Sequence, residues 1–162
     1  MQISETTRSD FELFWPVFKD VVSAQETYAF DPGIDLDTAY NLWCLSPQKS
    51  YVVKENDLVL GTYYLRANAS GPSSHIANCG YMVSPASRGK GIARMLCLHS
   101  QEIAIELGFT AMQYNSVVST NEVAVKLWQK LGYSIIGTIP NAYNHKRLGL
   151  VDSFIMHKQL IT

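Results

Sequence analysis

The sequence lacks the features that mark membrane-spanning, secreted and nucleic-acid-binding proteins. No stretch of its 162 residues approaches the roughly 20 consecutive apolar residues that a membrane-spanning helix needs. Glu5 and Asp10 interrupt the N-terminal segment where a signal peptide requires an apolar core. The formal net charge is only −1, so the broad basic surface of a general nucleic-acid binder is missing. We therefore expect neither a membrane nor a nucleic acid among its partners.

Cysteine and histidine are too scattered to predict a disulfide framework or a metal site. The three cysteines, Cys44, Cys79 and Cys97, are odd in number and contain no C-x-x-C pair, a pattern typical of a reducing compartment. The four histidines show no H-x-x-x-H spacing, so we predict no bound metal. The sequence therefore predicts a cytoplasmic protein without a metal cofactor.

The chain does contain enough apolar material for one folded domain. Hydrophobic residues make up 47% of the sequence and charged residues 17%, a balance that permits a sizeable core and argues against disorder. We find no internal repeat and no low-complexity tract. Residues 1–162 are therefore expected to form a single domain.

Hydrophobic periodicity and turn residues predict alternating strands and helices. The expected strands are 2–6, 51–54, 58–66, 76–83, 111–118, 133–139 and 151–158, and the expected helices are 10–24, 36–45, 89–107 and 120–131. Ser9 or Asp10 is expected to cap the first helix, and Ser119 with Glu122 offers a capping box for the last. Segments 67–75 and 140–150 are predicted to be irregular. This order indicates one layered α/β domain with a mixed sheet.

The most informative stretch joins the strand at 76–83 to the helix that follows it. From Arg88 to Arg94 the sequence RGKGIAR places two glycines and three cations at a helix N-terminus, which already carries about +0.5 of a charge. This arrangement makes sense if an anion binds free backbone N–H groups that the glycines leave accessible. It is not a P-loop, because no G-x-x-x-x-G-K-S/T occurs, and a dinucleotide fingerprint would meet Arg94 where a small residue belongs.

The spacing Arg88-x-x-Gly91-x-Ala93 resembles the (Q/R)-x-x-G-x-(G/A) signature of the GCN5-related N-acetyltransferase (GNAT) superfamily. A second stretch, N-x-x-A-x-x-x-W-x-x-x-G-Y over residues 121–133, is similar to that family's second block, and the order of elements agrees over nearly the whole chain. The resemblance implies a GNAT-like fold with a mixed, mostly antiparallel sheet of about six or seven strands and about four flanking helices. It implies acetyl-CoA as the cosubstrate.

The resemblance also implies which residues bind acetyl-CoA. The pyrophosphate would sit on the amides of 88–93, and the pantetheine arm would bond to backbone exposed where strand 76–83 splays away from strand 111–118. Gly80 fits a close approach in that strand, although a packing glycine explains it equally well. Asn121 can contact the cofactor and also cap a helix. The expected cofactor-binding residues are Tyr81, Met82, Val83, Arg88, Gly89, Lys90, Gly91, Ile92, Ala93 and Asn121.

The implied reaction is direct attack of a neutral amine on the acetyl thioester. An amine with a pKa near 10.4 is mostly protonated at neutral pH, so a group must accept its proton. The oxyanion needs an N–H donor, expected from the backbone of Tyr81–Val83. Many family members protonate the thiolate with a tyrosine, but this sequence has Trp128 there, whose indole N–H is not a practical acid. We therefore assign no general acid.

The acceptor side is expected to come from 25–32, Asn115 and 141–147, which are rich in Tyr and Asn and contain no acidic cluster. The tentative catalytic residues are Glu26, Tyr28 and Asn115, the last acting through a water. His75 and His145 are further candidates for the base.

The acceptor predicted from these segments is a small-molecule amine. Trp128 and the pair Tyr114-Asn115 are similar to yeast acetyltransferases acting on azetidine-2-carboxylate, which favours a small amino acid or a cyclic secondary amine. Two alternatives remain open: a non-catalytic acyl-CoA-binding regulatory protein, and a peptide or protein N-acetyltransferase. An open groove would favour the latter, and a site closed by the 140–150 loop would not. A homodimer is compatible with the aromatic residues near the C-terminal strands.

Overall fold

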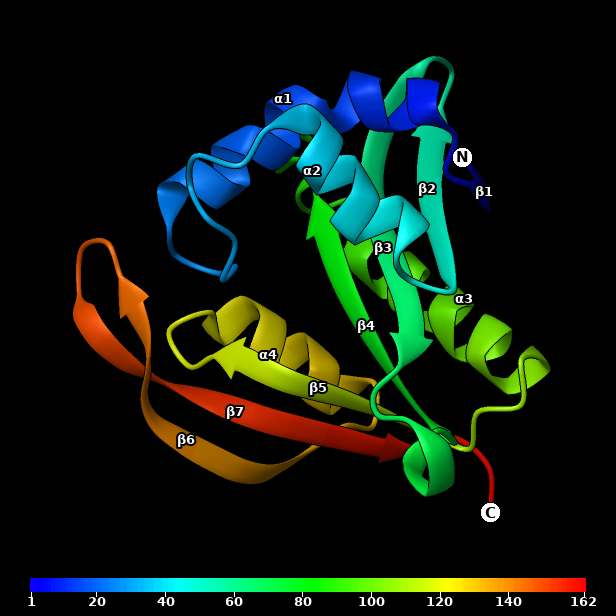
Figure 1. Cartoon of the computed structure of the whole chain (residues 1–162), viewed down its shortest axis with the longest axis vertical. Coiled ribbons are helices and arrows are strands. Elements are labelled where there is room, and N and C mark those ends of the chain that lie inside the picture. The colour runs from blue at the N-terminus through cyan, green and yellow to red at the C-terminus, as the bar shows by residue number, and fades with distance from the viewer.

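The chain folds around one seven-stranded sheet with the strand order β1-β2-β3-β4-β5-β7-β6 (Figure 1). The computed structural model describes residues 1–162. The strands are β1 (Gln2–Glu5), β2 (Lys49–Glu55), β3 (Leu58–Ala67), β4 (Ile76–Val83), β5 (Ala111–Val118), β6 (Ser134–His145) and β7 (Gly149–Gln159). The α-helices are α1 (Arg8–Ala24), α2 (Leu36–Tyr40), α3 (Ile92–Glu106) and α4 (Glu122–Lys130). The predicted order of elements is confirmed, and so is a mixed, mostly antiparallel sheet with four flanking helices.

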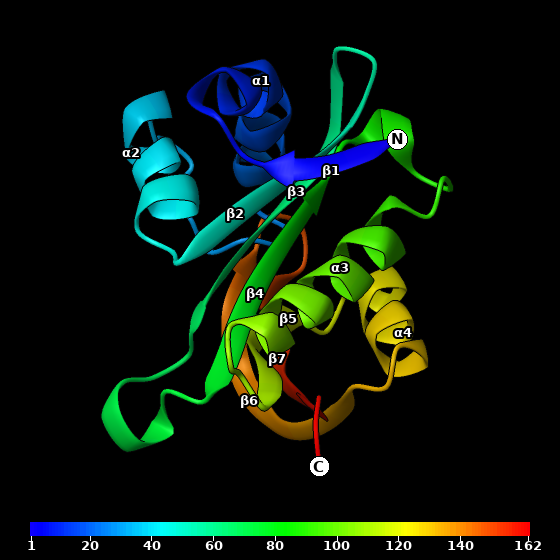
Figure 2. The same cartoon turned by 90° about the vertical axis from the view of Figure 1, so that its right-hand side faces the viewer.

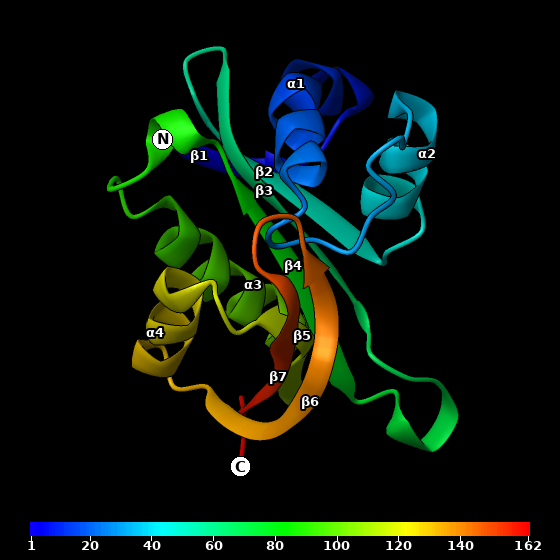
Figure 3. The ribbon, with the colours of Figure 1, turned by 90° about the vertical axis from the view of Figure 1, so that its left-hand side faces the viewer.

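Two helices cover each face of the sheet. Figures 2 and 3 show α1 and α2 on one side, and α3 and α4 on the other. The alternation along β3 explains this, because successive side chains of a strand point to opposite faces. Tyr63 and Leu65 belong to the core cluster under α3 and α4, whereas Tyr64 packs against the cluster formed by α1 and α2. None of the helices is both long enough and apolar enough to cross a membrane.

The sheet opens between its two central strands. β4 and β5 are its only parallel pair, and they are matched at two positions alone, Ile76 with Ala111 and Ala77 with Met112. Beyond Ala77 the strands separate, and Figure 1 shows β4 rising toward α1 while β5 runs toward the β6–β7 hairpin. Every other neighbouring pair is antiparallel. The sheet therefore has two halves that are hydrogen-bonded to each other only at the N-terminal ends of β4 and β5.

Several predicted helix starts were wrong by a few residues. Thr7, rather than Ser9 or Asp10, caps α1, and Asp10 completes the capping box by accepting a hydrogen bond from the Thr7 N–H at 3.0 Å. Ser119 does not cap α4, whereas the prediction that Asn121 can cap a helix is confirmed, with its side-chain oxygen 3.4 Å from the Ala124 nitrogen. A cap side chain must lie within one turn of the first free N–H groups, and these residues occupy that place.

The start of α3 and the predicted 140–150 loop also differ from expectation. α3 begins at Ile92 and not at Gly89, because Gly89 and Gly91 have φ angles of +80° and +73°, which a right-handed helix cannot contain. Segment 140–150 is largely strand, since β6 and β7 pair up to His145 and Gly149. Sequence reasoning missed the end of β6 because β6 is an edge strand, where a proline and a bulge are tolerated.

Candidate active site

The backbone of β4 turns alternate residues toward the gap between β4 and β5. In an antiparallel pair, every second residue directs both its N–H and its C=O at the partner strand. The Ser84 N–H donates to the Leu60 carbonyl on β3 at 2.9 Å, so the even-numbered residues of β4 face β3. Tyr81 and Val83 therefore direct their backbone groups away from β3. Because β5 pairs with β4 no further than Ala77, no strand occupies the hydrogen-bonding positions beside them.

Met82 lies differently from Tyr81 and Val83, although sequence reasoning grouped the three. Met82 is matched with Thr62 of β3, so its N–H and C=O serve the sheet. Its side chain is buried in the cluster beneath α1 and α2. Only the odd-numbered members of the predicted trio can present backbone groups to a ligand in the gap.

A cluster of free amides lies where β4 leads into α3. Lys90 N–H donates to the Ser87 carbonyl and Arg88 N–H to the Pro85 carbonyl, both at 3.3 Å. The first three N–H groups of a helix have no partner inside it, and Gly91 offers no side-chain cap. The amides without a partner, which we call the amide cradle, are those of Gly89, Gly91, Ile92, Ala93 and Arg94.

Both glycines of the amide cradle are needed for its shape and its accessibility. Their positive φ angles are strained for any other residue, and a Cβ atom at either position would meet no atom within 4 Å. No protein atom therefore lies close to the Cβ side of either glycine.

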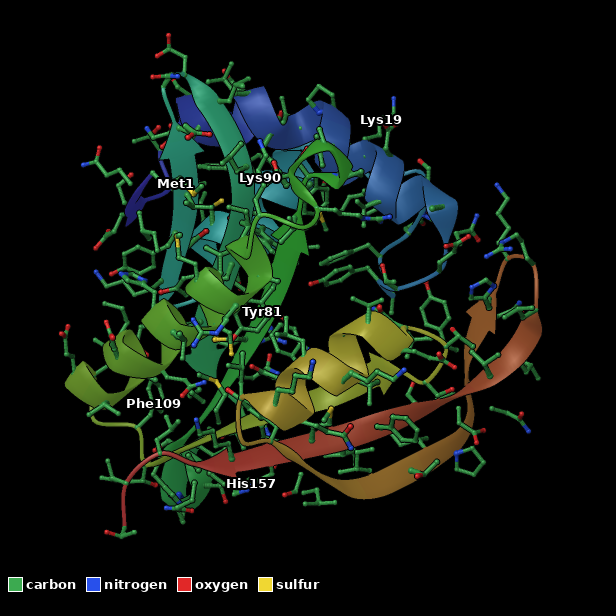
Figure 4. All side chains as sticks on the ribbon, turned by 180° about the vertical axis from the view of Figure 1, so that it is seen from behind. Met1, Lys19, Tyr81, Lys90, Phe109 and His157 are labelled. Atoms are coloured by element: carbon green, nitrogen blue, oxygen red, sulfur yellow. The ribbon has the colours of Figure 1, made fainter.

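The charge around the amide cradle suits an anion. Arg88, Lys90 and Arg94 are exposed and form no ion pair with an acidic side chain. Figure 4 shows Lys90 in the connection to α3, and Tyr81 between α3 and α4. Five free amides, a helix N-terminus and three unpaired cations fit the pyrophosphate of acetyl-CoA, and the backbone of Tyr81 and Val83 fits its extended arm.

Tyr28 reaches β4 from the segment that follows α1. Its hydroxyl donates a hydrogen bond to the Tyr81 carbonyl, one of the groups that point into the gap. Burial raises the pKa of the Tyr28 hydroxyl well above its usual range, so the group keeps its proton at neutral pH. Tyr28 therefore has the geometry of a positioning residue that holds β4, with its hydroxyl acting as a donor.

Tyr64 is a residue of the site that sequence reasoning missed. It is matched with Gly80 across β3 and β4, and its ring lies directly over that glycine. A Cβ at position 80 would come within 2.5 Å of the Tyr64 ring, and the Tyr64 hydroxyl donates to the Asn78 side-chain oxygen at 3.3 Å. Gly80 is thus a packing glycine for Tyr64. A glycine inside a strand was the available signal, but only the register identifies its partner.

Asn115 lies on the same face of the sheet as Tyr64, next to a bulge in β5. Its side-chain amide donates to the Asn68 side-chain oxygen at 2.6 Å, and its own oxygen accepts from Gln113 at 3.1 Å. The Asn78 amide spans the opening gap to the Gln113 carbonyl at 3.0 Å. We call this face the acceptor face and define it by Tyr64, Arg66, Asn68, Asn78, Gln113 and Asn115. Asn115 is exposed there and can orient a ligand or a water.

The β6–β7 hairpin is joined to the segment after α1 by three contacts. The Tyr143 hydroxyl donates to the Tyr28 carbonyl at 2.8 Å, and the Lys146 N–H donates to the Gln25 carbonyl at 3.1 Å. The Arg147 guanidinium forms an ion pair with the Glu26 carboxylate at 3.1 Å. We call these contacts the bridge. Figure 3 shows the hairpin in front of β4, with its tip just below α1.

The two histidine candidates for the base lie outside this arrangement. His145 is buried in the hairpin turn, where its Nδ1 accepts the N–H groups of Arg147 and Leu148 at 3.1 and 3.2 Å. His75 is exposed, and its carbonyl accepts the Thr110 N–H at 2.9 Å. His145 thus shapes the turn that carries Arg147, and His75 helps to join β4 to the loop before β5.

Trp128 packs where the family resemblance expects an acid. Its ring centroid lies 5.0 Å from that of Tyr81 and 5.4 Å from that of Tyr114, within the core between the sheet and α4. The Tyr81 hydroxyl is 3.0 Å from that of Tyr114, and burial raises the pKa of both well above the usual range. None of these three aromatic side chains is therefore a ready proton donor to a thiolate.

Known proteins share this fold and this sequence pattern. A family model described as "Acetyltransferase (GNAT) family" matches residues 11–133. N-acetyltransferase aca1 of Schizosaccharomyces pombe is 33% identical over 150 residues, which are 92% of this chain and 66% of that protein. This chain thus spans slightly less than two thirds of that relative.

Solved structures agree closely with the whole chain. A GCN5-related N-acetyltransferase from Kribbella flavida superposes with a TM-score of 0.91 at 41% identity, covering 98% of this chain and 96% of that one. A putative acetyltransferase from Salmonella typhimurium, solved with its cofactor acetyl-CoA, has the same fold, with a TM-score of 0.84 at 21% identity. The match covers 100% of this chain and 95% of the Salmonella typhimurium chain.

Proposed function

The chain belongs to the GNAT family of acetyltransferases and uses acetyl-CoA, and on that premise we propose that it acetylates the amine of a small molecule. The acceptors that we favour are small amino acids and cyclic secondary amines. We further propose that the protein works in the cytoplasm, a location that its three free cysteines support.

The bridge is the observation that carries the proposal of a small acceptor. It joins the β6–β7 hairpin to the segment after α1 beside the acceptor face, at Tyr28, Gln25 and Glu26. A peptide chain crossing this face would have to pass the hairpin or break the bridge. A small amine needs neither, so the bridge favours it over a protein substrate.

The amide cradle and β4 are the parts of the chain that would hold acetyl-CoA. The cradle amides, with Arg88 and Lys90, would bind the pyrophosphate, and the backbone of Tyr81 and Val83 would bind the extended arm. When bound, acetyl-CoA supplies a thioester carbonyl carbon that a neutral amine can attack. Backbone N–H groups of β4 that face the gap would stabilise the charge that develops on the carbonyl oxygen.

The side chains of the acceptor side would position the amine and guide its proton. Tyr28 fixes the Tyr81 carbonyl, Asn115 orients the acceptor or a water that takes the proton, and Glu26 holds the hairpin through Arg147. A C–N bond forms as the C–S bond breaks, and the leaving thiolate gains a proton from solvent because Trp128 has none to give.

Two measurements test the proposed function in sequence. The first is calorimetric titration of the protein with acetyl-CoA, with NADH as the control; we expect one acetyl-CoA per chain and no NADH. The second follows CoA release with a panel of small amines and of peptides with free N-termini. Turnover of small amines supports the proposal. Turnover of peptides alone, or acetyl-CoA binding without transfer to any amine, would overturn it.

A further inference from the structure

We infer that Arg66, stacked on Tyr64, binds a carboxylate on the acceptor, so that the preferred substrates are amines that carry a carboxyl group. The inference rests on the proposed function and extends it to a residue of the acceptor face with no role so far. It follows from the pairing of Arg66, its position relative to the gap and the groups that surround it.

The first argument is that Arg66 is a cation without a partner. The sequence has five arginines. Arg8 and Arg147 form ion pairs with acidic side chains, and Arg88 and Arg94 flank or belong to the amide cradle. Arg66 is exposed on β3, and its side chain forms neither an ion pair nor a hydrogen bond within the chain. Outside the amide cradle it is the single arginine whose charge is unmatched.

The second argument is that the Arg66 guanidinium is held in place. Its central carbon lies 5.3 Å from the centroid of the Tyr64 ring, within the range of a cation–π contact. That ring is itself pinned over Gly80, and its hydroxyl is bonded to Asn78. A guanidinium stacked on a fixed ring loses less conformational entropy on binding, and its planar fork suits the two oxygens of a carboxylate.

The third argument is the charge of the surroundings. The strands β3, β4 and β5 contain no aspartate and no glutamate. Next to Arg66 the acceptor face offers carboxamides: Asn78 of β4 is matched with Arg66, and Asn68 follows the last residue of β3. In Figure 1 this face points toward the viewer, and the stretch below α2 has no helix over it. The Arg66 guanidinium, surrounded by neutral carboxamides that can form hydrogen bonds, is suited to bind an anion.

The fourth argument is the distance to the reacting centre. Tyr64 lies over Gly80, next to the Tyr81 carbonyl that faces the gap, where the amine must arrive. Arg66 is two residues farther along β3, about 7 Å from Tyr64 at the usual strand rise. A molecule that carries its amine and its carboxylate a few bonds apart can therefore reach both places. This arrangement selects amino acids over simple amines.

The experiment compares matched acceptors, each amino acid with its own amide, in the full-length enzyme. Replacing the carboxylate by a carboxamide keeps the size and the amine but removes the charge. We expect the Arg66→Gln variant to lower kcat/KM for the acid by about 10- to 100-fold, as for a lost hydrogen bond to a charged group, and to leave the amide unchanged. Taking the variant-to-wild-type ratio for each acceptor cancels the difference in amine pKa.

Two further variants sharpen the result. Arg66→Lys should restore only part of the preference, because an ammonium cannot form the two parallel bonds of a guanidinium. Arg8→Gln changes an exposed arginine at the start of α1 whose side-chain partners, Glu12, Asp37 and Tyr40, are not acceptor-face residues. This variant serves as the matched control and should leave both acceptors unchanged. Unaltered acetyl-CoA affinity and thermal unfolding would show that each variant is folded.

The outcomes separate this inference from the proposed function. If Arg66→Gln lowers kcat/KM for acid and amide equally, or for neither, Arg66 does not bind a carboxylate and the inference is wrong, while the enzyme remains a small-amine acetyltransferase. If the wild-type enzyme turns over neither acid nor amide and accepts only peptides, the proposed function itself fails, and the carboxylate site fails with it.

Discussion

The amide cradle and the acceptor face are built from different materials. The cradle consists of backbone N–H groups from one continuous segment, Gly89–Arg94. The acceptor face consists of side chains, and its bridge uses side chains of residues far apart in sequence: Tyr143 contacts Tyr28 at a separation of 115 positions, and Arg147 contacts Glu26 at a separation of 121. One end of the site is local and made of backbone, and the other is distant and made of side chains.

This difference explains how one fold can keep a cosubstrate while its acceptor changes. A backbone N–H is present in every residue except proline, so substitutions that keep the loop shape keep the cradle. Side chains carry the acceptor face, so a single substitution there changes what it recognises. Damage to the cradle should therefore abolish acetyl-CoA binding for every acceptor, whereas damage to the acceptor face should leave that binding intact.

Gly91→Glu is the substitution that we expect to weaken acetyl-CoA binding by the amide cradle most. Gly91 has a φ of +73° and a free N–H, and a glutamate there would add strain, bulk and a negative charge beside the pyrophosphate. Because like charges brought together cost several kcal/mol, we expect acetyl-CoA affinity to fall by about 100-fold or more in a calorimetric titration.

Gly108→Glu is the matched control for Gly91→Glu. Gly108 follows the other end of α3 and has a φ of +91°, and a Cβ atom added there would meet no atom within 4 Å. The substitution therefore imposes similar backbone strain away from the cradle. Equal losses of affinity in the two variants would mean that strain, and not the cradle, explains the effect.

Gly80→Ala is the substitution that we expect to disturb the acceptor face most. The added Cβ would lie 2.5 Å from the Tyr64 ring, so the ring must move or the strands must shift. Overpacking of this kind costs about 1–3 kcal/mol, and we expect that loss in chemical denaturation together with a higher KM for the acceptor. Acetyl-CoA affinity should not change.

Gly137→Ala and a double variant test the cause of the Gly80 effect. A Cβ at Gly137, also in a strand, meets only the Ile155 side chain at an ordinary 3.7 Å, so that variant should be nearly neutral. Adding Tyr64→Ala to Gly80→Ala removes the clash, so the stability losses of the two substitutions should sum to more than the loss in the double variant, while the acceptor KM should stay high. A wild-type acceptor KM in the double variant would show that Tyr64 has no part in acceptor binding.

The contrast between a local backbone motif and contacts between distant side chains also explains which parts of the fold and the site the sequence could predict. The bounds of β4 and β5 were predicted to the residue, because they depend on local patterns. Anion binding by the turn into α3 rests on a local pattern too, and it stays a prediction. Tyr64 and Arg66 were missed, and so were the individual contacts of the bridge, although the family resemblance implied that segments 25–32 and 141–147 both lie on the acceptor side. Tyr64 meets Gly80 only through the register of β3 on β4, and the bridge needs the whole chain between α1 and β7 to fold first. Local motifs contain no information about either.

Tyr28→Phe separates positioning from acid–base chemistry. The variant loses the hydrogen bond to the Tyr81 carbonyl, which is worth up to about a tenfold fall in kcat. The raised pKa of Tyr28 means that its hydroxyl stays protonated through the working range and loses its proton only at pH well above the usual value for tyrosine. The kcat profile between about pH 6 and 9 should therefore keep its shape in the variant. Loss of its acidic limb would show instead that Tyr28 is the base.

The smallest effect should come from the bridge, tested by Glu26→Gln and Arg147→Gln side by side. The two side chains are 40% and 70% exposed, and an exposed ion pair contributes at most about 1 kcal/mol. Each variant should therefore raise the acceptor KM by about fivefold at most, and high salt should erase the difference because it screens the pair in the wild type as well. The two variants should behave alike, since each removes the same contact and the backbone bond from Lys146 to Gln25 remains. A large fall in kcat in Glu26→Gln alone would contradict this, because it would mean that the Glu26 carboxylate accepts the amine proton and that the acceptor side has a catalytic group as well as a binding face.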